Sequence, residues 1–195
     1  KPAARAAAGG GGGLGGERDG LAGSWGKMFM RGGYTSTASC LLPSALVNTC
    51  ETACTWAAFP ALHAAVLRSA RAAIREACGV EGHVTCRLTH VYPDGPAPYY
   101  TVVVRGVRCD DPPAGEDDAR IGMWLAIKRA MMASIIQHGG TSTHHHAVGR
   151  LHVPDFEAER GALCGTYLAA AKAAHDPAGI MNPGVLLGSR AQSKL

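Results

Sequence analysis

Residues 84–107 read VTCRLTHVYPDGPAPYYTVVVRGV. Two runs rich in β-branched and aromatic residues, 84–91 and 99–107, flank the tetrapeptide Pro-Asp-Gly-Pro at 93–96. β-Branched and aromatic residues favour strands, and Pro, Asp and Gly in succession supply the backbone conformations of a tight turn. The stretch therefore predicts a β-hairpin, and this hairpin decides the fold class.

Side chains alternate between two faces along a strand. In the first run, alternation predicts one face with Arg87, Thr89 and Val91 and the other with Leu88, His90 and Tyr92. Tyr99 begins the returning run, opposite or near Tyr92. A tyrosine hydroxyl beside imidazoles can pass a proton or hold an oxyanion, although packing is the commoner role of a lone tyrosine. Arg87 can bind a phosphate through two parallel hydrogen bonds, or it can form a surface ion pair.

A helical pattern precedes the hairpin. Leu62, Val66, Ala70 and Ile74 recur at every fourth position, while arginines fall on other faces. Pro60 suits the first turn of a helix, and Gly79 suits the position just after its end. We therefore expect a helix over residues 58–78, preceded by a strand over 46–52.

A second helical pattern follows the hairpin, over residues 116–138. Its predicted apolar face consists of Ile121, Leu125, Met132 and Ile136. Lys128 and Arg129 are expected to point away from that face. Gly139 and Gly140 follow, and glycine tolerates the left-handed conformation that ends many helices.

A third helix is expected from residue 154 to about residue 174, closed by the Asp-Pro pair at 176–177. The order strand, helix, strand, strand, helix predicts an α+β fold. Its antiparallel sheet would carry helices packed on one face, in a ferredoxin-like arrangement, followed by a C-terminal helical tail.

The composition fits one packed domain. The chain has 195 residues, of which 47% are hydrophobic, and a formal net charge of +4 with neutral histidines. No basic block is interleaved with aromatic residues, which argues against nucleic-acid binding. The seven cysteines show no framework of close pairs, so reduced and mostly buried thiols are expected. The Gly- and Ala-rich residues 1–24 are expected to be a flexible segment.

Residues 138–150 read HGGTSTHHHAVGR and are the main candidate for chemistry. Imidazole exchanges protons near neutral pH, so His144, His145 and His146 are candidate catalytic residues. Glycines such as Gly140 let the backbone approach a ligand closely. Two other interpretations stay open: an exposed polar loop, and a metal site. Adjacent side chains rarely converge on one ion, so no metal-ligand set is predicted.

Two C-terminal stretches carry further signals. Residues 176–187 read DPAGIMNPGVLL and predict an ordered loop, because Pro and Gly restrict the backbone there. The chain ends in Ser193-Lys194-Leu195. A peroxisomal import receptor reads this tripeptide at a free C-terminus, and residues 188–195 are polar enough to present it as a flexible tail.

Together these motifs resemble the FAD-linked oxidase family related to vanillyl-alcohol oxidase, and within it the alkyldihydroxyacetonephosphate (alkylglycerone-phosphate) synthases. GGTSTHHHAVG at 139–149 resembles their triple-histidine loop, and TCRLTHVY at 85–92 resembles their hairpin. NTCETACTW at 48–56 resembles a strand end of the same enzymes, and 176–187 resembles the C-terminal signature of the wider family. The resemblance covers residues 51–187 in matching order.

The resemblance implies the C-terminal substrate (cap) domain of an FAD-linked oxidase over residues 25–187. Such a domain packs against an N-terminal FAD-binding domain, which we expect to lie outside this chain. The implied cofactor is FAD, and the implied substrates are acyl-dihydroxyacetone phosphate and a fatty alcohol. The reaction would exchange the acyl group for the alcohol in ether-lipid biosynthesis, in a peroxisome or glycosome. A homodimer of the full-length protein and contact with a membrane surface are also expected.

The resemblance also implies roles for single residues. His145 would remove the C1 proton of the substrate, and Tyr99 would be the catalytic tyrosine. The candidate substrate-binding residues are Arg87 and Tyr92. The candidate cofactor contacts are His144, His146, Asn182 and Gly140.

Two positions depart from the family pattern. The family carries an arginine for the substrate phosphate in a Tyr-x-Arg-Asp stretch, but residues 34–42 contain no arginine, which leaves Arg31 or Arg87. Ala147 stands where a glycine is usual. Two other functions stay open: an FAD-linked oxidoreductase of a 2-hydroxy acid or alcohol, and a noncatalytic remnant that binds partners.

Overall fold

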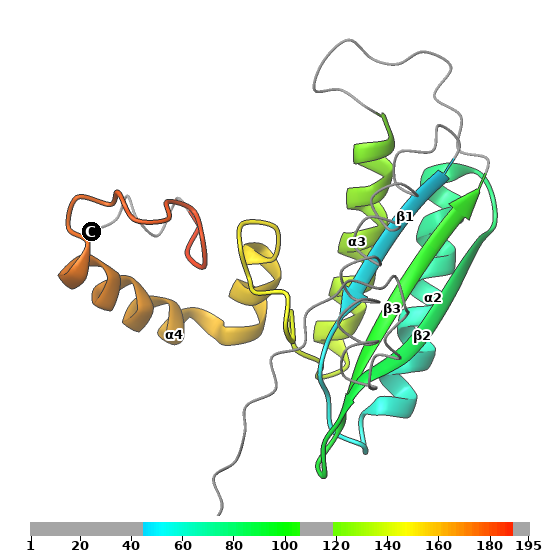
Figure 1. The fold of residues 1–195 in the computed structure, drawn as a ribbon, viewed down its shortest axis with the longest axis horizontal. Coiled ribbons are helices and arrows are strands. Elements are labelled where there is room, and N and C mark those ends of the chain that lie inside the picture. The colour runs from blue at the N-terminus through cyan, green and yellow to red at the C-terminus, as the bar shows by residue number, and fades with distance from the viewer. Residues whose placement is uncertain (1–44, 106–118, 189–195) are drawn as a thin grey trace, which may run out of the picture. The chain divides into compact units, whose positions relative to one another are not determined.

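The structure is a computed structural model that describes residues 45–105 and 119–188 (Figure 1). Its elements in chain order are β1 (Ala45–Glu51), α2 (Phe59–Cys78), β2 (Gly82–Val91), β3 (Pro96–Arg105), α3 (Ala119–Gln137) and α4 (Val153–His175). The segment 1–24, Arg31 and the C-terminal tripeptide Ser193-Lys194-Leu195 lie outside the described residues.

The three strands form one antiparallel sheet in the order β1-β3-β2. The predicted hairpin is confirmed as β2 and β3, and Gly95 lies in its turn. A Cβ atom at Gly95 would collide with the carbonyl oxygen of Cys54, so only glycine fits this close approach. The order β1-α2-β2-β3-α3 matches the first five elements of a ferredoxin-like domain, and the predicted α+β class is confirmed.

Helices α2 and α3 pack side by side on one face of the sheet (Figure 1). The predicted apolar face of α2 is confirmed, because all four of its periodic residues are fully buried. Alternate residues of β3 point into the same core, which is why its sequence runs apolar at every second position. The core comprises Leu46, Cys50, Leu62, Val66, Ala70, Ile74, Tyr100, Val102, Val104, Ile127, Met131, Met132 and Ile135.

The apolar face predicted for α3 is partly wrong. Ile121 is 52% exposed, whereas Lys128, which was expected to point away, is buried. The Lys128 Nζ donates a hydrogen bond of 2.6 Å to the backbone oxygen of Thr49 in β1, so its charge has a partner inside the interface. Most sides of α3 carry apolar residues, and periodicity alone therefore does not fix which side packs against the sheet.

Strand β2 contains a β-bulge that breaks the predicted alternation. Leu88 pairs with Pro98, but His90 pairs with Ala97, so Thr89 is an extra residue in the ladder. The Thr89 hydroxyl donates to the Ala97 carbonyl at this point. Because of the bulge, His90 shares a face with Arg87 instead of lying opposite it.

Helix α4 bends at Gly161, whose φ of 72° and ψ of 171° are not helical. The segment after α4 folds back on the turn at its start: the Arg150 guanidinium donates to the Pro183 carbonyl, and the Leu186 amide donates to the Gly149 carbonyl. Within the described residues, no helix has the length and apolar character needed to cross a membrane. The five cysteines of the described ranges are free thiols.

Candidate functional site

The candidate site lies on the sheet face opposite α2 and α3. Tyr99 of β3 pairs with Glu51 of β1 on one side and with Arg87 of β2 on the other, so these three side chains share that face. The bulge adds His90 to the same face. Tyr99 lies opposite Arg87 and not opposite Tyr92, because Tyr92 belongs to the turn and hydrogen-bonds Gly95.

The histidine loop is joined to the chain that continues from β1. Thr141 exchanges three hydrogen bonds with Thr52 and Ala53: its amide donates to the Ala53 carbonyl, its hydroxyl accepts from the Ala53 amide, and its carbonyl accepts from the Thr52 hydroxyl. Gly140, just before it, is buried, and a Cβ there would lie 2.7 Å from the Thr52 Oγ1. Gly140 therefore has a packing reason to be glycine, and its predicted contact with a cofactor stays a prediction.

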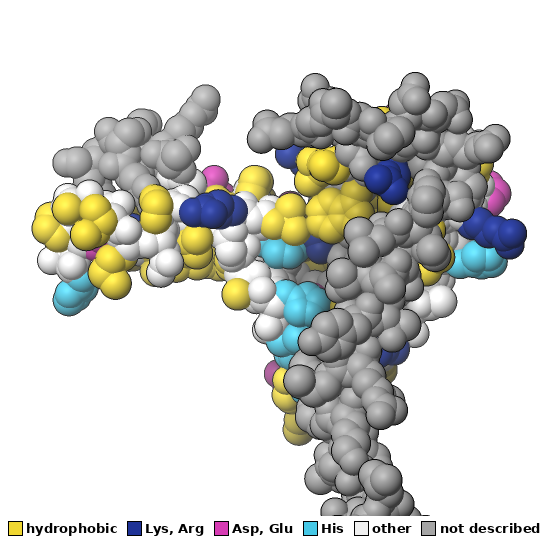
Figure 2. Space-filling view, turned by 45° about the horizontal axis from the view of Figure 1, so that its top comes forward, with side chains coloured by type: hydrophobic (Ala, Val, Ile, Leu, Met, Phe, Trp, Pro, Cys, Tyr) yellow, Lys and Arg dark blue, Asp and Glu magenta, His cyan; other side chains and the backbone are white. Residues whose placement is uncertain are grey.

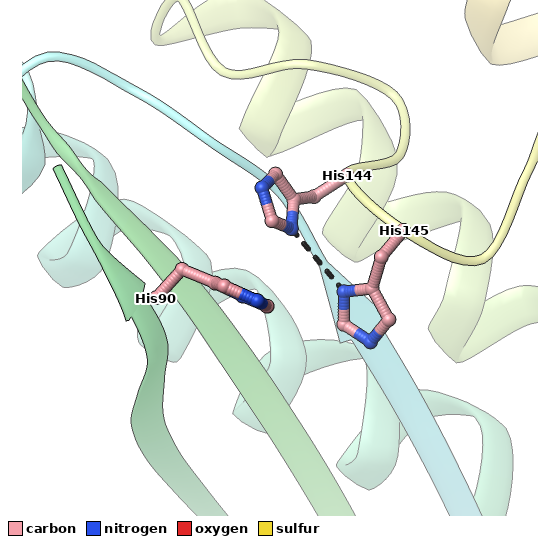
Figure 3. A group of neighbouring side chains, drawn as sticks. All are labelled: His90, His144 and His145. Atoms are coloured by element: carbon pink, nitrogen blue, oxygen red, sulfur yellow. Dashed lines mark hydrogen bonds between the residues drawn. The ribbon is translucent and has the colours of Figure 1, made fainter.

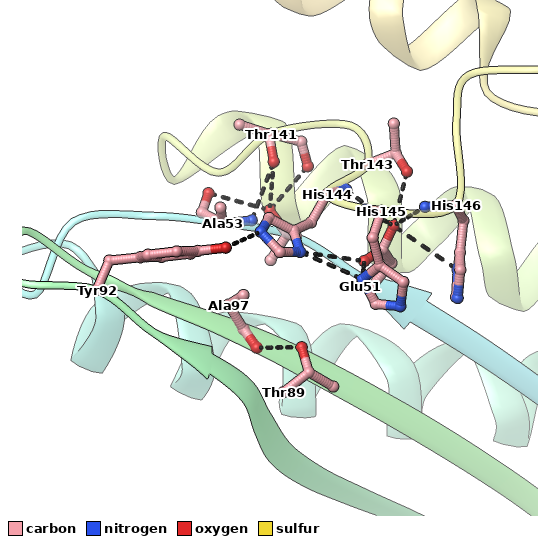
Figure 4. A network of polar contacts seen from close by, with 11 residues as sticks. Glu51, Ala53, Thr89, Tyr92, Ala97, Thr141, Thr143, His144, His145 and His146 are labelled. Carbon is pink, nitrogen blue, oxygen red and sulfur yellow. Dashed lines mark hydrogen bonds and ion pairs between the residues drawn. The ribbon is translucent and has the colours of Figure 1, made fainter. Parts of the chain in front are cut away.

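The rings of the three histidines gather over the sheet face (Figure 4). His145 stacks on Tyr99 with ring centroids 6.1 Å apart, and His146 meets the same ring edge-on at 5.5 Å. His144 lies toward the hairpin, where its Nε2 is 3.0 Å from the Tyr92 hydroxyl. The structure thus brings five of the predicted site residues together: His145 and His146 on the Tyr99 ring, and His144 on Tyr92.

His90 joins this group from β2 (Figure 3). Its ring centroid is 4.8 Å from that of His144 and 5.8 Å from that of His145. The surface seen in Figure 2 accordingly carries adjacent histidine side chains. His90 was not among the predicted site residues, and the bulge that brings it to the face of Arg87 and Tyr99 has no signal in the sequence.

Glu51 is the buried carboxylate beneath the loop and was also missed as a functional residue. It is only 2% exposed. Burial by itself would raise the pKa of Glu51, but hydrogen bonds from the Thr143 hydroxyl and from the amides of residues 144, 146 and 145 outweigh it and lower the pKa from 4.5 to about 2. A carboxylate at a strand end next to a threonine was the sequence signal, but nothing in the sequence linked it to a loop some ninety residues later.

Two of the imidazoles have lowered pKa values. Burial lowers the pKa of His144 and outweighs the opposite effect of the Glu51 charge, with smaller lowering from His90 and His145. Burial likewise comes first in lowering the pKa of His146. Both rings are therefore neutral at neutral pH and can accept or donate a hydrogen bond without adding positive charge.

Arg87 stands on the exposed side of the same face. Its guanidinium carbon lies 4.7 Å from the centre of the Tyr99 ring. It forms no ion pair with the acidic residues of the described ranges, so the surface ion pair considered for it is absent there. Its charge is open to a ligand beside Tyr99.

Asn182 is exposed in the segment after α4, with a left-handed φ of 46°. Its carbonyl accepts a hydrogen bond from Val185. The hydrogen bonds and ring contacts of the three histidines involve residues of β1, the hairpin and the loop itself, and Asn182 is not among them. Its role at the cofactor stays a prediction.

Two overlapping groups have metal-ligand atoms within 4.8 Å of one another, namely His90, His144 and His145, and Glu51, His145 and His146. The possible ligand atoms therefore lie closer together than we expected from the sequence, because adjacent side chains rarely converge on one ion. Several of these atoms already have protein partners, since His144 contacts Tyr92 and the Glu51 oxygens meet the loop.

An antiparallel sheet with helices on one face and a histidine loop on the other defines an α+β domain with a ligand-facing surface. Residues 27–186 match the family model of the FAD linked oxidases, C-terminal domain. The chain belongs to this family, and the expected cofactor FAD is confirmed with it.

Two relatives make the comparison more specific. Alkyldihydroxyacetonephosphate synthase of Trypanosoma brucei brucei is 34% identical over 116 residues, which are 60% of this chain and 18% of that protein. A solved structure of an alkyldihydroxyacetonephosphate synthase has a TM-score of 0.52 and 16% identity, over 82% of this chain and 24% of that chain. At this identity the structural likeness shows the fold alone.

The side chains on the open face fit a flavin in their chemistry. Tyr99, His145 and His146 offer ring surfaces to a planar heterocycle. The neutral imidazoles offer donors and acceptors for its polar edge, and Arg87 offers a positive charge for a phosphate.

Proposed function

We propose that this chain is the C-terminal domain of a flavin-dependent transferase that replaces the acyl group of acyl-dihydroxyacetone phosphate with a fatty alcohol. The observation that carries the proposal is the group of His145, His146, Tyr99 and Arg87 on one open sheet face of a domain of the FAD-linked oxidase family. The similarity to the trypanosome synthase supports the particular substrate. When bound, FAD supplies the reactive ring system beside which the exchange takes place.

His145 is the general base in this proposal. Its side chain is 37% exposed, so a substrate can reach it, and it stacks on Tyr99. Removal of a proton from carbon next to a ketone needs a base within hydrogen-bond distance, and imidazole is the side chain most often found in that role. The neighbouring His146 ring has a lowered pKa and is neutral, so it adds no positive charge that would oppose proton uptake by His145.

Tyr99 and Arg87 bind the polar end of the substrate. The exposed guanidinium of Arg87 forms charge-assisted hydrogen bonds to the phosphate, and its position over the Tyr99 ring keeps it close to the reacting carbon. The Tyr99 hydroxyl donates to the substrate oxygen on which negative charge develops after proton removal. Tyr92, held by His144, contributes a second hydroxyl at the edge of the site.

The direct test is exchange between acyl-dihydroxyacetone phosphate and a labelled fatty alcohol by the purified full-length protein, with no electron acceptor present. We expect exchange in the wild type and its abolition in His145→Ala, with FAD absorbance retained. His83→Ala is the matched control, because His83 is an exposed histidine at the other end of the hairpin, opposite Val103. Near-normal exchange in His145→Ala would remove His145 from the role of base.

A second candidate is oxidation of a 2-hydroxy acid or an alcohol, which the family name itself favours. Proton removal from carbon by His145 would serve that reaction as well. Bleaching of the flavin by a hydroxy acid, with turnover only in the presence of an electron acceptor, would support this candidate. Exchange without an acceptor would support the transferase.

A peroxisomal or glycosomal location is part of the proposal. It rests on the terminal tripeptide Ser193-Lys194-Leu195, which an import receptor would bind. A fluorescent protein carrying residues 188–195 at its C-terminus should enter the organelle, and the same fusion with one further residue after Leu195 should remain outside. Equal distribution of the two fusions would contradict the location.

A further inference from the structure

Glu51 occupies a position that its residue type does not explain. It is the last residue of β1 and pairs with Tyr99 on the sheet face away from the helices. That face carries exposed side chains such as Arg87, yet Glu51 is 2% exposed because the histidine loop covers it. Burial of a carboxylate costs free energy unless its oxygens have hydrogen-bond or charged partners. The surroundings of the two Glu51 oxygens therefore show what this residue does.

The Oε1 atom holds the loop backbone. It accepts a hydrogen bond of 2.7 Å from the Thr143 hydroxyl and bonds of 2.8 Å from the amides of His144, His145 and His146 (Figure 4). Three consecutive amides that converge on one oxygen form a concave anion site. These contacts fix the path of the loop and keep the carboxyl group ionised.

The Oε2 atom faces an imidazole instead. It lies 2.5 Å from the His145 Nδ1 and 3.8 Å from the His144 Nδ1. No donor of the described residues, His145 included, is aligned well enough for a hydrogen bond to this oxygen, so the approach of His145 is a close ion-pair contact. An ionised carboxylate attracts a protonated ring nitrogen and repels one that carries a lone pair, so the short contact favours the tautomer of a neutral His145 ring with its proton on Nδ1. The Nε2 of that ring then carries the free lone pair.

The position of the proton on His145 also affects the hydrogen bonds of His144 and Tyr92. The Nδ1 atoms of His144 and His145 are 3.2 Å apart (Figure 3). A protonated His145 Nδ1 has no lone pair to accept a proton from His144, so this contact is a hydrogen bond only when His144 Nδ1 is the acceptor and the His144 proton is on Nε2. That Nε2–H donates to the Tyr92 oxygen 3.0 Å away, which leaves the Tyr92 hydroxyl proton directed to a ligand.

We propose that Glu51 is a positioning residue that sets the tautomers of His145 and His144, so that His145 presents an unprotonated Nε2 and Tyr92 presents a hydroxyl donor to the substrate. The role of this Nε2 as the base rests on the proposed function. The tautomer assignment rests only on the contacts of Glu51. Histidine bases in other enzymes are oriented by a carboxylate on the opposite ring nitrogen in the same manner.

The critical variant is Glu51→Gln. Its side-chain oxygen can still accept the four donors that hold the loop, but its amide group now faces His145 Nδ1 as a donor. His145 Nδ1 must then become an acceptor, which moves the proton to Nε2. We expect nitrogen NMR of histidine-labelled full-length protein to show Nδ1–H for His145 in the wild type and Nε2–H in the variant, with signals assigned from His145→Ala. The rate at which the enzyme replaces the acyl group with the fatty alcohol should fall by about 100-fold, with little change in KM.

Glu159→Gln is the matched control. Glu159 also holds this loop, because its Oε2 accepts a 2.7 Å hydrogen bond from the Ser142 amide, but that bond involves no imidazole. This control should keep the wild-type tautomer and exchange rate. An effect equal to that of Glu51→Gln would reduce Glu51 to one of two general anchors of the loop and overturn the proposal.

The wild-type spectrum alone can also overturn the proposal, even if Glu51→Gln does not fold. Nε2–H as the main tautomer of wild-type His145 would contradict it, and so would loss of exchange in Glu51→Gln with an unchanged tautomer. A wild type that shows Nδ1–H but has no exchange activity would refute the transferase function and still support the positioning role.

Discussion

Two carboxylates of this domain, Asp176 and Glu51, each bind consecutive backbone amides of one segment, and they differ in how far along the chain that segment lies. Asp176 accepts bonds from the amides of Ile180 and Met181 and from the Lys172 ammonium, all within five positions of it. Glu51 accepts from residues 143–146, which are more than ninety positions away. A local anchor forms as soon as its helix end forms, whereas a distant anchor exists only when sheet and loop have met.

Removal of the distant anchor should have the largest effect. Glu51→Ala leaves a buried hydroxyl and three amides without an acceptor, which should cost about 3 kcal/mol of unfolding free energy. Asp176→Ala should cause a smaller loss. Urea unfolding measures the totals, and hydrogen exchange should show faster exchange at residues 143–146 in the first variant and at 180–181 in the second. Equal losses of unfolding free energy in Glu51→Ala and Asp176→Ala would contradict the difference between the two anchors.

Acid should act on the two anchors by the same mechanism but most visibly at Glu51. Its pKa is lowered from 4.5 in the unfolded chain to about 2, so its stabilisation is complete above the higher value and is lost as the pH falls through the lower one. The loss is on the order of 3 kcal/mol. Urea unfolding of the wild type at pH values across this window should show an unfolding free energy that decreases as the pH falls. The part of this decrease that comes from Glu51 should be missing in Glu51→Gln. An equal slope in the variant would assign the acid response to other groups.

Gly140→Ala should loosen the start of the histidine loop. The added methyl group would lie 2.7 Å from atoms of Thr52 and Ile135 and 2.8 Å from Leu62, which should cost about 1–3 kcal/mol. Gly122→Ala is the control, because Gly122 of α3 has open space around it and alanine is the better helix former. Thermal unfolding should rank Gly140→Ala below the wild type and Gly122→Ala at or above it.

The smallest expected effect is a gain. Ala147 follows the three histidines with a left-handed φ of 64°, where a side chain is strained and glycine is not. This backbone conformation accounts for the glycine expected at that position from the family resemblance. Ala147→Gly should stabilise the fold by up to about 1 kcal/mol, after subtraction of the greater chain entropy of glycine. A lower melting temperature would contradict this account.

The parts of the fold that local rules govern were predicted correctly. The hairpin followed from the β-rich runs around Pro-Asp-Gly-Pro, and α2 followed from its apolar period and Gly79, whose φ of 67° is that of a helix C-cap. The grouping of the histidines with Tyr99 followed from the family resemblance and agrees with the ring contacts.

The parts that depend on contacts between distant segments were not predictable. Lys128 is buried because a strand carbonyl happens to receive its ammonium group, which no helical period reveals. Glu51 has its role because a loop far along the chain covers it. His90 entered the site through a bulge, and nothing in the residues around Thr89 distinguishes a bulged strand from a regular one.

The extra residue in β2 also affects how this chain should be compared with others. Before Thr89 the strand follows one even-odd phase, and after it the opposite phase. In a homologue without the insertion, an ungapped alignment through this strand would match His90 and Val91 with residues on the wrong side of the sheet. One gap at residue 89 would restore the correspondence, so apparent substitutions at these two positions need that gap before they are counted as changes of chemistry.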